Sequence, residues 1–165
     1  MWKRVVSYAV AAVLGVLSAF LLSGVFIIEE VYGNGMEPAL KNGSKVIINK
    51  LAFDGDGGEN VEAGSLIAFR SDVYGEDGEG RILIRRVAAV PGDTVEIKND
   101  IFYVNDKPYT EYMKEAVHLD PMVKIKLGDY KVFVLSDDRK SSMDSRNEAI
   151  GLVDIRECLG RVCFR

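Results

Sequence analysis

Residues 81–104 read RILIRRVAAVPGDTVEIKNDIFYV and hold three short segments rich in Val and Ile. Pro91-Gly92-Asp93 closes the first segment, because Pro presets a turn conformation and Gly and Asp tolerate the φ values that turns need. Asn99-Asp100 separates the second and third segments by two residues, which is the spacing of a tight β-hairpin. This stretch therefore predicts three consecutive strands over residues 81–90, 94–98 and 101–104.

Four further segments have the same composition and extend the β pattern along the chain. They cover residues 45–50, 65–69, 131–135 and 159–164. Residues 109–128 are of mixed character, and the sequence assigns no element to them. The strand spacing predicts a mainly β fold, with a mostly antiparallel domain that is either a sandwich or a partly closed barrel.

An apolar run without any charged residue occupies residues 5–28. A helix of this length is roughly 36 Å long, which exceeds a hydrocarbon core of about 30 Å. Lys3 and Arg4 precede the run and Glu29 and Glu30 follow it, so the positive-inside rule keeps the N-terminus cytoplasmic. The sequence predicts a cytoplasmic segment 1–4, a transmembrane anchor 5–28 and an extracytoplasmic domain 29–165. A cleavable signal is the alternative, but its apolar part is usually only about 7–15 residues long.

The predicted outer domain is acidic. Removing Lys3 and Arg4 from the 21 basic residues leaves 19 against 25 acidic residues, a net charge of −6. This balance argues against a nucleic-acid or acidic partner. A single His, His118, and two Cys argue against a structural zinc site, and we expect neither a metal nor a cofactor.

Cys158 and Cys163 lie on one predicted strand. On a straight strand their α-carbons would be about 16 Å apart at about 3.3 Å per residue. A disulfide needs less than about 7 Å. The sequence therefore predicts two unbonded, buried cysteines, although an extracytoplasmic compartment would permit a disulfide.

Four stretches read as motifs. They are GNGMEPAL at residues 33–40, AGSLIAF at 63–69, IRRVAAVPGD at 84–93 and SDDRKSSMDSR at 136–146. In order and character these stretches resemble the sequence boxes of the type I signal peptidase family, behind an anchor of the matching orientation. The resemblance implies a signal peptidase I-type β domain whose groove binds the cleavage segment of a secreted protein as an added strand.

The resemblance also places the catalytic pair of the family. In active members a Ser of the first box attacks the peptide bond, and a Lys of the third box is the general base. A Ser hydroxyl needs such a base, and a buried Lys can supply a neutral amine. Here the nucleophile position is Gly35 and the base position is Arg85. Because glycine has no side chain and arginine stays protonated, both halves of the dyad are missing.

Other site positions are retained or changed. The resemblance implies supporting roles for Ser142, Asp144 and Arg146, whereas Ser136 and Asp138 replace a Gly and an Asn of the family motif. It also places Met36 and Pro38 among the substrate-binding residues, with Met36 helping to seat the domain on the bilayer.

Asp144 and Arg146 would lie on one face of a strand, where they can form an ion pair. Adjacent strand residues face opposite sides, so Arg85 or Arg86 must point inward, and Asp144 is a candidate partner.

Two functions follow from this resemblance. The first is a catalytically inactive signal peptidase homologue in the cell membrane that binds preproteins or pilin-like polypeptides and aids surface assembly of the pilus type. The alternative is an active serine endopeptidase with a relocated nucleophile, for which Ser142 or Ser136 are the candidates and Lys140 the conceivable base. A structural relic that binds nothing is a third class.

Overall fold

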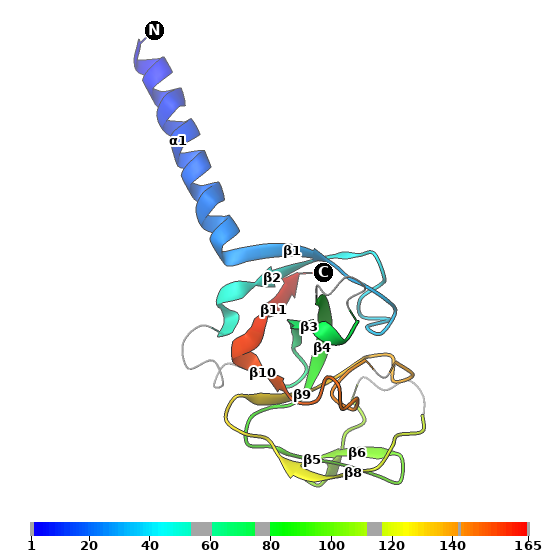
Figure 1. Ribbon diagram of the computed structural model, residues 1–165. Coiled ribbons are helices and arrows are strands. Elements are labelled where there is room, and N and C mark those ends of the chain that lie inside the picture. The colour runs from blue at the N-terminus through cyan, green and yellow to red at the C-terminus, as the bar shows by residue number, and fades with distance from the viewer. Residues whose placement is uncertain (1, 54–60, 75–79, 112–116, 142, 165) are drawn as a thin grey trace.

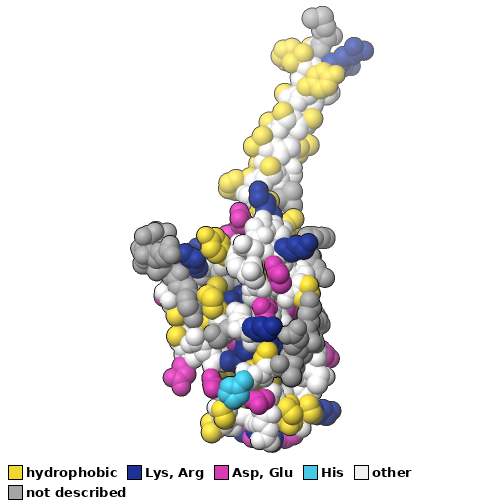
Figure 2. Space-filling model, turned by 90° about the vertical axis from the view of Figure 1, so that its right-hand side faces the viewer, with side chains coloured by type: hydrophobic (Ala, Val, Ile, Leu, Met, Phe, Trp, Pro, Cys, Tyr) yellow, Lys and Arg dark blue, Asp and Glu magenta, His cyan; other side chains and the backbone are white. Residues whose placement is uncertain are grey.

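The structure is a computed structural model that describes residues 2–53, 61–74, 80–111, 117–141 and 143–164. A single long helix, α1 (Trp2–Val25), stands away from a β domain (Figure 1). By length and composition the helix is long and apolar enough to cross a membrane. Basic side chains gather at its N-terminal tip, and hydrophobic side chains line its length (Figure 2). An N-terminal membrane anchor fits this element.

The helix is displaced from the predicted apolar run of residues 5–28. It begins at Trp2 and ends at Val25, and the next five residues form strand β1 (Phe26–Glu30). β1 pairs antiparallel with β2 (Lys45–Asn49), with Ile28 opposite Ile47. Apolar residues 26–28 therefore belong to the β domain, because their backbone groups find partners on β2 rather than within the helix.

The β domain consists of two antiparallel sheets. The larger has the strand order β1-β2-β11-β3-β4-β9-β10, and the smaller the order β7-β6-β5-β8. The other strands of the larger sheet are β3 (Leu66–Ser71), β4 (Arg81–Ala89), β9 (Lys131–Leu135), β10 (Val153–Asp154) and β11 (Cys158–Phe164). Those of the smaller sheet are β5 (Thr94–Lys98), β6 (Ile101–Val104), β7 (Lys107–Pro108) and β8 (Met122–Lys126). Short 3-10 turns cover Lys50–Phe53, Asp72–Tyr74 and Ile155–Glu157. The predicted mainly antiparallel β domain is confirmed, and the described strands form no closed barrel.

The predicted hairpin between β5 and β6 is also confirmed. Asn99 and Asp100 have φ values of 52° and 62°, the left-handed conformation that a two-residue hairpin turn requires. Asn105 and Asp106, with φ values of 52° and 64°, make the equivalent turn between β6 and β7. Asn and Asp tolerate this conformation better than most residues, which explains why both turns use this pair.

Both faces of the larger sheet are covered, as the alternation along β3 shows. Ile67 and Phe69 belong to one buried cluster, whereas Leu66 and Ala68 belong to another that includes Met36. Successive strand residues point to opposite faces, so a strand buried on both sides reads as a continuous apolar run. A third cluster joins the two sheets, where the rings of Phe102 and Phe133 stack with centroids 4.9 Å apart.

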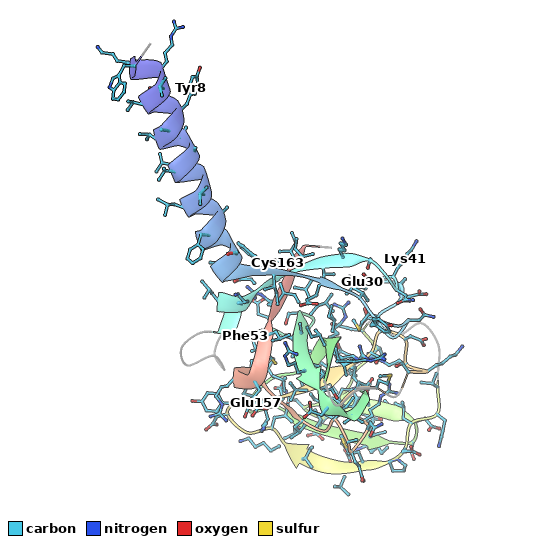
Figure 3. The ribbon with its side chains drawn as sticks, turned by 45° about the horizontal axis from the view of Figure 1, so that its top comes forward. Tyr8, Glu30, Lys41, Phe53, Glu157 and Cys163 are labelled. Carbon is cyan, nitrogen blue, oxygen red and sulfur yellow. The ribbon has the colours of Figure 1, made fainter. Side chains whose placement is uncertain are left out.

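Both cysteines are free, as predicted. The predicted burial holds only in part. Cys158 is half-buried and Cys163 is exposed. Burial raises the pKa of the Cys158 thiol to about 12. Cys163 lies near the junction of α1 with the domain, whereas Glu157, the neighbour of Cys158, lies at the opposite end of β11 (Figure 3). The prediction of burial was wrong for Cys163, because it lies at the irregularity where the pairing of β11 with β2 shifts register between Val162 and Phe164.

Candidate functional site

The loop between β1 and β2 carries the first sequence motif. Met36 and Leu40 are 1% and 2% exposed and anchor the loop in the core, and the Leu40 amide donates to the Met36 carbonyl at 2.8 Å. Gly33 has a φ of 76°, a conformation that glycine adopts without steric cost. Its amide donates to the Asn42 side chain at 2.9 Å. The loop is thus held in place, with the half-buried Gly35 presented at its edge.

Gly35 and Arg85 lie side by side, although fifty positions separate them in the chain. A β-carbon built on Gly35 would lie 3.6 Å from Arg85 Nη2 and 3.1 Å from Ser141 Oγ. The Asp138 amide donates to the Gly35 carbonyl at 2.9 Å and ties the loop to the fourth motif. The structure therefore brings together three of the four motifs at one point.

The Arg85 side chain is buried, with 4% of its surface exposed. Its Nε donates to the Met143 carbonyl at 2.6 Å and its Nη1 to the Ile84 carbonyl at 2.6 Å. The guanidinium thus links β4 to the segment that contains the fourth motif. A group held in this way is a permanent cation and a hydrogen-bond donor, and it cannot accept a proton.

Arg86 is buried as well, and its partner is not the one that the sequence suggested. It forms a two-point ion pair with Asp137, with distances of 2.7 Å from Nε to Oδ1 and 2.6 Å from Nη2 to Oδ2. Its Nη1 donates to the Gly64 carbonyl at 2.6 Å. Asp144, the candidate partner from the sequence, is instead taken by Arg146, because both lie in one tight turn.

Asp144 and Arg146 form the predicted ion pair, but not on a strand as expected. They lie in a turn, where Arg146 Nε and Nη2 approach the two carboxylate oxygens of Asp144 at 2.8 and 2.7 Å. Asp144 is fully buried and also accepts the Ser136 amide at 2.8 Å. Arg146 donates onward to the carbonyls of Arg139 and Ser141. The pair therefore fixes the course of the whole segment beside Gly35.

Comparison with known proteins decides the family. Residues 2–165 match the family described as signal peptidase, peptidase S26. The chain belongs to this signal peptidase family. It is 31% identical to signal peptidase IB of Staphylococcus aureus (strain Mu50) over 182 residues, which is 98% of this chain and 86% of that relative. It is 32% identical to signal peptidase I S of Bacillus subtilis (strain 168) over 179 residues, which is 98% of this chain and 89% of that relative. Its function is thus signal peptidase I-like.

A solved structure is also similar. The signal peptidase I of Enterococcus faecalis V583 superimposes with a TM-score of 0.49 at 22% identity, over 62% of this chain and 97% of that one.

Within this signal peptidase site, two substrate-binding candidates differ in exposure. Met36 is 1% exposed and packs in the cluster beneath its loop, so in this structure it offers no surface to a bilayer or a substrate. Pro38 is exposed and lines a cavity of about 230 Å³ together with Glu37, Val117 and residues 137–140. Ser142 lies outside the described residues.

Ser141 and Arg139 are site residues that sequence reasoning missed. The sequence motif assigns no role to Ser141, yet its hydroxyl is the atom nearest to the β-carbon built on Gly35. Arg139 is 7% exposed and donates to the Ser136 carbonyl at 2.5 Å, and burial lowers its pKa below the ordinary arginine value. The Ser-Asp-Asp-Arg motif signalled the place of Arg139, but only the fold shows that its guanidinium turns inward.

Ser136 does not have the environment of a relocated nucleophile. It is fully buried, and its Oγ has no hydrogen-bond partner among the described residues. Lys140, the conceivable base, is exposed. A nucleophile must reach both substrate and a general base, so Ser136 is not suited to the role.

Ser136→Ala is expected to leave the free energy of unfolding unchanged or to raise it by up to about 1 kcal/mol, because a buried hydroxyl without a partner is unfavourable. Urea unfolding in detergent measures this. Ser145→Ala is the matched control: that buried hydroxyl accepts the Val134 amide at 3.0 Å, and its loss should cost about 1–2 kcal/mol. A larger loss for Ser136→Ala than for Ser145→Ala would contradict the assignment.

Proposed function

We propose that this protein is a catalytically inactive signal peptidase homologue that binds secreted or membrane-held preproteins. The observation that carries the proposal is that Gly35 and Arg85 lie next to each other at the positions of the family's dyad, since a β-carbon built on Gly35 would lie 3.6 Å from Arg85 Nη2. Neither residue can supply a nucleophile or a general base at neutral pH. The rest of the site, by contrast, is ordered by the ion pairs of Arg86 with Asp137 and Arg146 with Asp144.

The edge of β4 supports a binding role. β4 pairs with β3 from Arg81 to Arg86, but it pairs with β9 only from Arg86 onward. Among the described residues, no strand pairs with the other edge of β4 ahead of Arg86. An unpaired edge offers backbone groups to an extended peptide, which gains main-chain hydrogen bonds as an added strand. Tyr32 lies beside this segment, with the Arg81 guanidinium 4.9 Å from its ring centre.

The membrane anchor determines on which side of the membrane the β domain would bind a preprotein. We propose that α1 crosses the cell membrane with its basic tip on the cytoplasmic side, by the positive-inside rule. The β domain then lies on the outer face, where preproteins emerge. A non-cleaving member of the family in this position suits surface assembly of the pilus type, with a pilin-like polypeptide as the partner.

Cleavage and capture assays on the purified full chain in detergent test this function. We expect no cleavage of a preprotein at its A-x-A site. A photoreactive residue at Tyr32, which is 66% exposed near the edge of β4, should crosslink to the preprotein. The same residue at Val123, which is 81% exposed on β8 in the other sheet, is the control and should crosslink far less.

Cleavage by the unmodified chain would overturn the proposed inactivity, and its loss on Ser142→Ala would then identify a relocated nucleophile. Equal crosslinking from Tyr32 and Val123, or none, would overturn the proposed binding and leave a structural relic as the better description.

A further inference from the structure

A cavity of about 970 Å³ lies between the smaller sheet and the segment that follows β9. Its apolar wall comes from the cluster that joins the two sheets, in which Ile97, Leu119 and Phe133 are buried. Met122 and Ile125 of β8 extend this wall and are half-buried. Pockets that hold small molecules usually measure about 300–1,000 Å³ and combine apolar walls with a few polar groups. The cavity therefore has the size and the wall of a ligand site.

Arg139 places a buried cation in this cavity. The residue is 7% exposed, and its Nη1 donates to the Ser136 carbonyl at 2.5 Å and its Nη2 to the Glu111 carbonyl at 3.5 Å. A guanidinium has five N–H donors, so these two bonds leave donors for a ligand. Among the residues that the structure describes, no carboxylate forms an ion pair with Arg139.

The carboxylates that act on Arg139 electrostatically are bound to other arginines. Asp137 pairs with Arg86 at 2.6 Å and Asp144 with Arg146 at 2.7 Å. Their attraction does not outweigh burial, which lowers the pKa of Arg139 below the ordinary arginine value. A buried charge is costly unless an opposite charge lies against it, so an anion that enters the cavity would offset this cost.

The remaining charges of the lining lie at its rim. The acidic residues there are Asp120 and Glu148, and both are exposed. Water and salt screen exposed charges, so these two carboxylates oppose an anion far less than the buried guanidinium attracts it. The inner part of the cavity thus favours one negative group among apolar side chains.

We infer that this cavity binds a small amphiphile, an apolar molecule that carries one carboxylate. The carboxylate accepts from Arg139, and the apolar body packs against Ile125 and Phe133. This site is separate from the edge of β4, and the inference goes beyond the proposed function because it requires no preprotein.

The position of the cavity indicates the source of the ligand. The smaller sheet lies at the end of the β domain opposite α1 (Figure 1). With α1 in a membrane, a ligand reaches this end from water, so the carboxylate belongs to a soluble small molecule rather than to a lipid of the bilayer. A polypeptide fits less well, because its main-chain amides would lie unpaired against the apolar wall.

A matched pair of aromatic compounds tests the inference. Naphthoate carries the carboxylate, and naphthamide has the same apolar body without the charge. Binding to the full chain in lipid nanodiscs is measured by calorimetry, and empty nanodiscs correct for partition into lipid. We expect naphthoate to bind with a dissociation constant of about 1 mM or lower. Naphthamide should bind at least about tenfold more weakly, since charge-assisted hydrogen bonds are roughly twice as strong as neutral ones.

Two kinds of variant separate the charge from the space. Arg139→Gln should abolish the preference for the acid, whereas Arg70→Gln, at an exposed position of β3, is the matched control and should keep it. If Arg139→Gln fails to fold in a thermal melt, Ile125→Trp serves in its place, because it fills the cavity and keeps the charge. It should weaken naphthoate binding at least about fivefold. Val123→Trp, on the same strand at a position that is 81% exposed, should leave the affinity unchanged.

Several results would overturn the inference. Equal binding of acid and amide by the unmodified chain, or binding of neither, contradicts it. So does an unchanged preference in folded Arg139→Gln or an unchanged affinity in folded Ile125→Trp. Displacement of naphthoate by a capped Leu-Glu-Leu peptide at a lower concentration than by octanoate would assign the cavity to a polypeptide instead. None of these measurements depends on crosslinking from Tyr32, so the proposed function stands or falls separately.

Discussion

Changing Gly35 to Ser and Arg85 to Lys together is expected to create preprotein cleavage, at least about 100-fold above either single variant. The new β-carbon would lie in ordinary contact with the residue-85 side chain, and only the Ser141 hydroxyl, at 3.1 Å, must turn aside. A Lys at position 85 would be buried, as Arg85 is. Burial lowers the pKa of an amine, so its neutral form becomes available as a base.

Each single variant should stay inert, because nucleophile and base act as a unit. Cleavage is followed on gels, and the cut site by mass spectrometry. The matched control combines Gly35→Ala with Arg85→Lys, which adds the same β-carbon without a hydroxyl and should remain inactive. An inactive but folded double variant would show that the edge of β4 no longer holds a preprotein in register with position 35.

Asp144→Ala is expected to have the largest effect on stability, a loss of about 3–5 kcal/mol in the free energy of unfolding. Asp144 is fully buried, accepts the Ser136 amide and receives two guanidinium hydrogen bonds from Arg146. Its removal leaves Arg146, whose side chain is 12% exposed, as a poorly compensated buried cation. Urea unfolding in detergent, followed by circular dichroism, measures the change.

Two comparisons make this result specific. Asp129→Ala, at an exposed position, should change the free energy of unfolding by no more than about 0.5 kcal/mol. Combining Asp144→Ala with Arg146→Met should cost less than Asp144→Ala alone, because the unpaired cation is then removed as well. A double variant less stable than the single one would show that Arg146 acts through its bonds to the Arg139 and Ser141 carbonyls, and not as the ion-pair partner of Asp144.

The strands with strong local signals were predictable. β4, β5 and β6 follow the apolar runs and turn residues of the 81–104 stretch, and the pair Asn99-Asp100 fixes the hairpin between β5 and β6. β8 could not be placed, because its five residues alternate only weakly and its partner β5 lies more than twenty positions away. β7 and β10 have two residues each, which is too short for any periodicity.

The end of the helix shows a different limit. Residues 26–28 are as apolar as those before them, and a membrane helix and a buried strand use the same side chains. The pairing of β1 with β2 decides that residues 26–28 form a strand and not the end of the helix, and β2 lies fifteen residues beyond β1 in the chain. Local sequence therefore could not locate this boundary.

The sequence by itself determined the family resemblance, the β character of the domain, and the absence of a nucleophile at Gly35 and of a base at Arg85, because these depend only on side-chain chemistry. Only the tertiary structure decided which charges neutralise one another and which groups surround Gly35. Arg86 pairs with Asp137 and Arg146 with Asp144, while Ser141 and Arg85 each lie beside Gly35. Ion pairing and access depend on distances of a few ångströms between residues that can lie more than a hundred positions apart in the chain, and chain folding alone sets those distances.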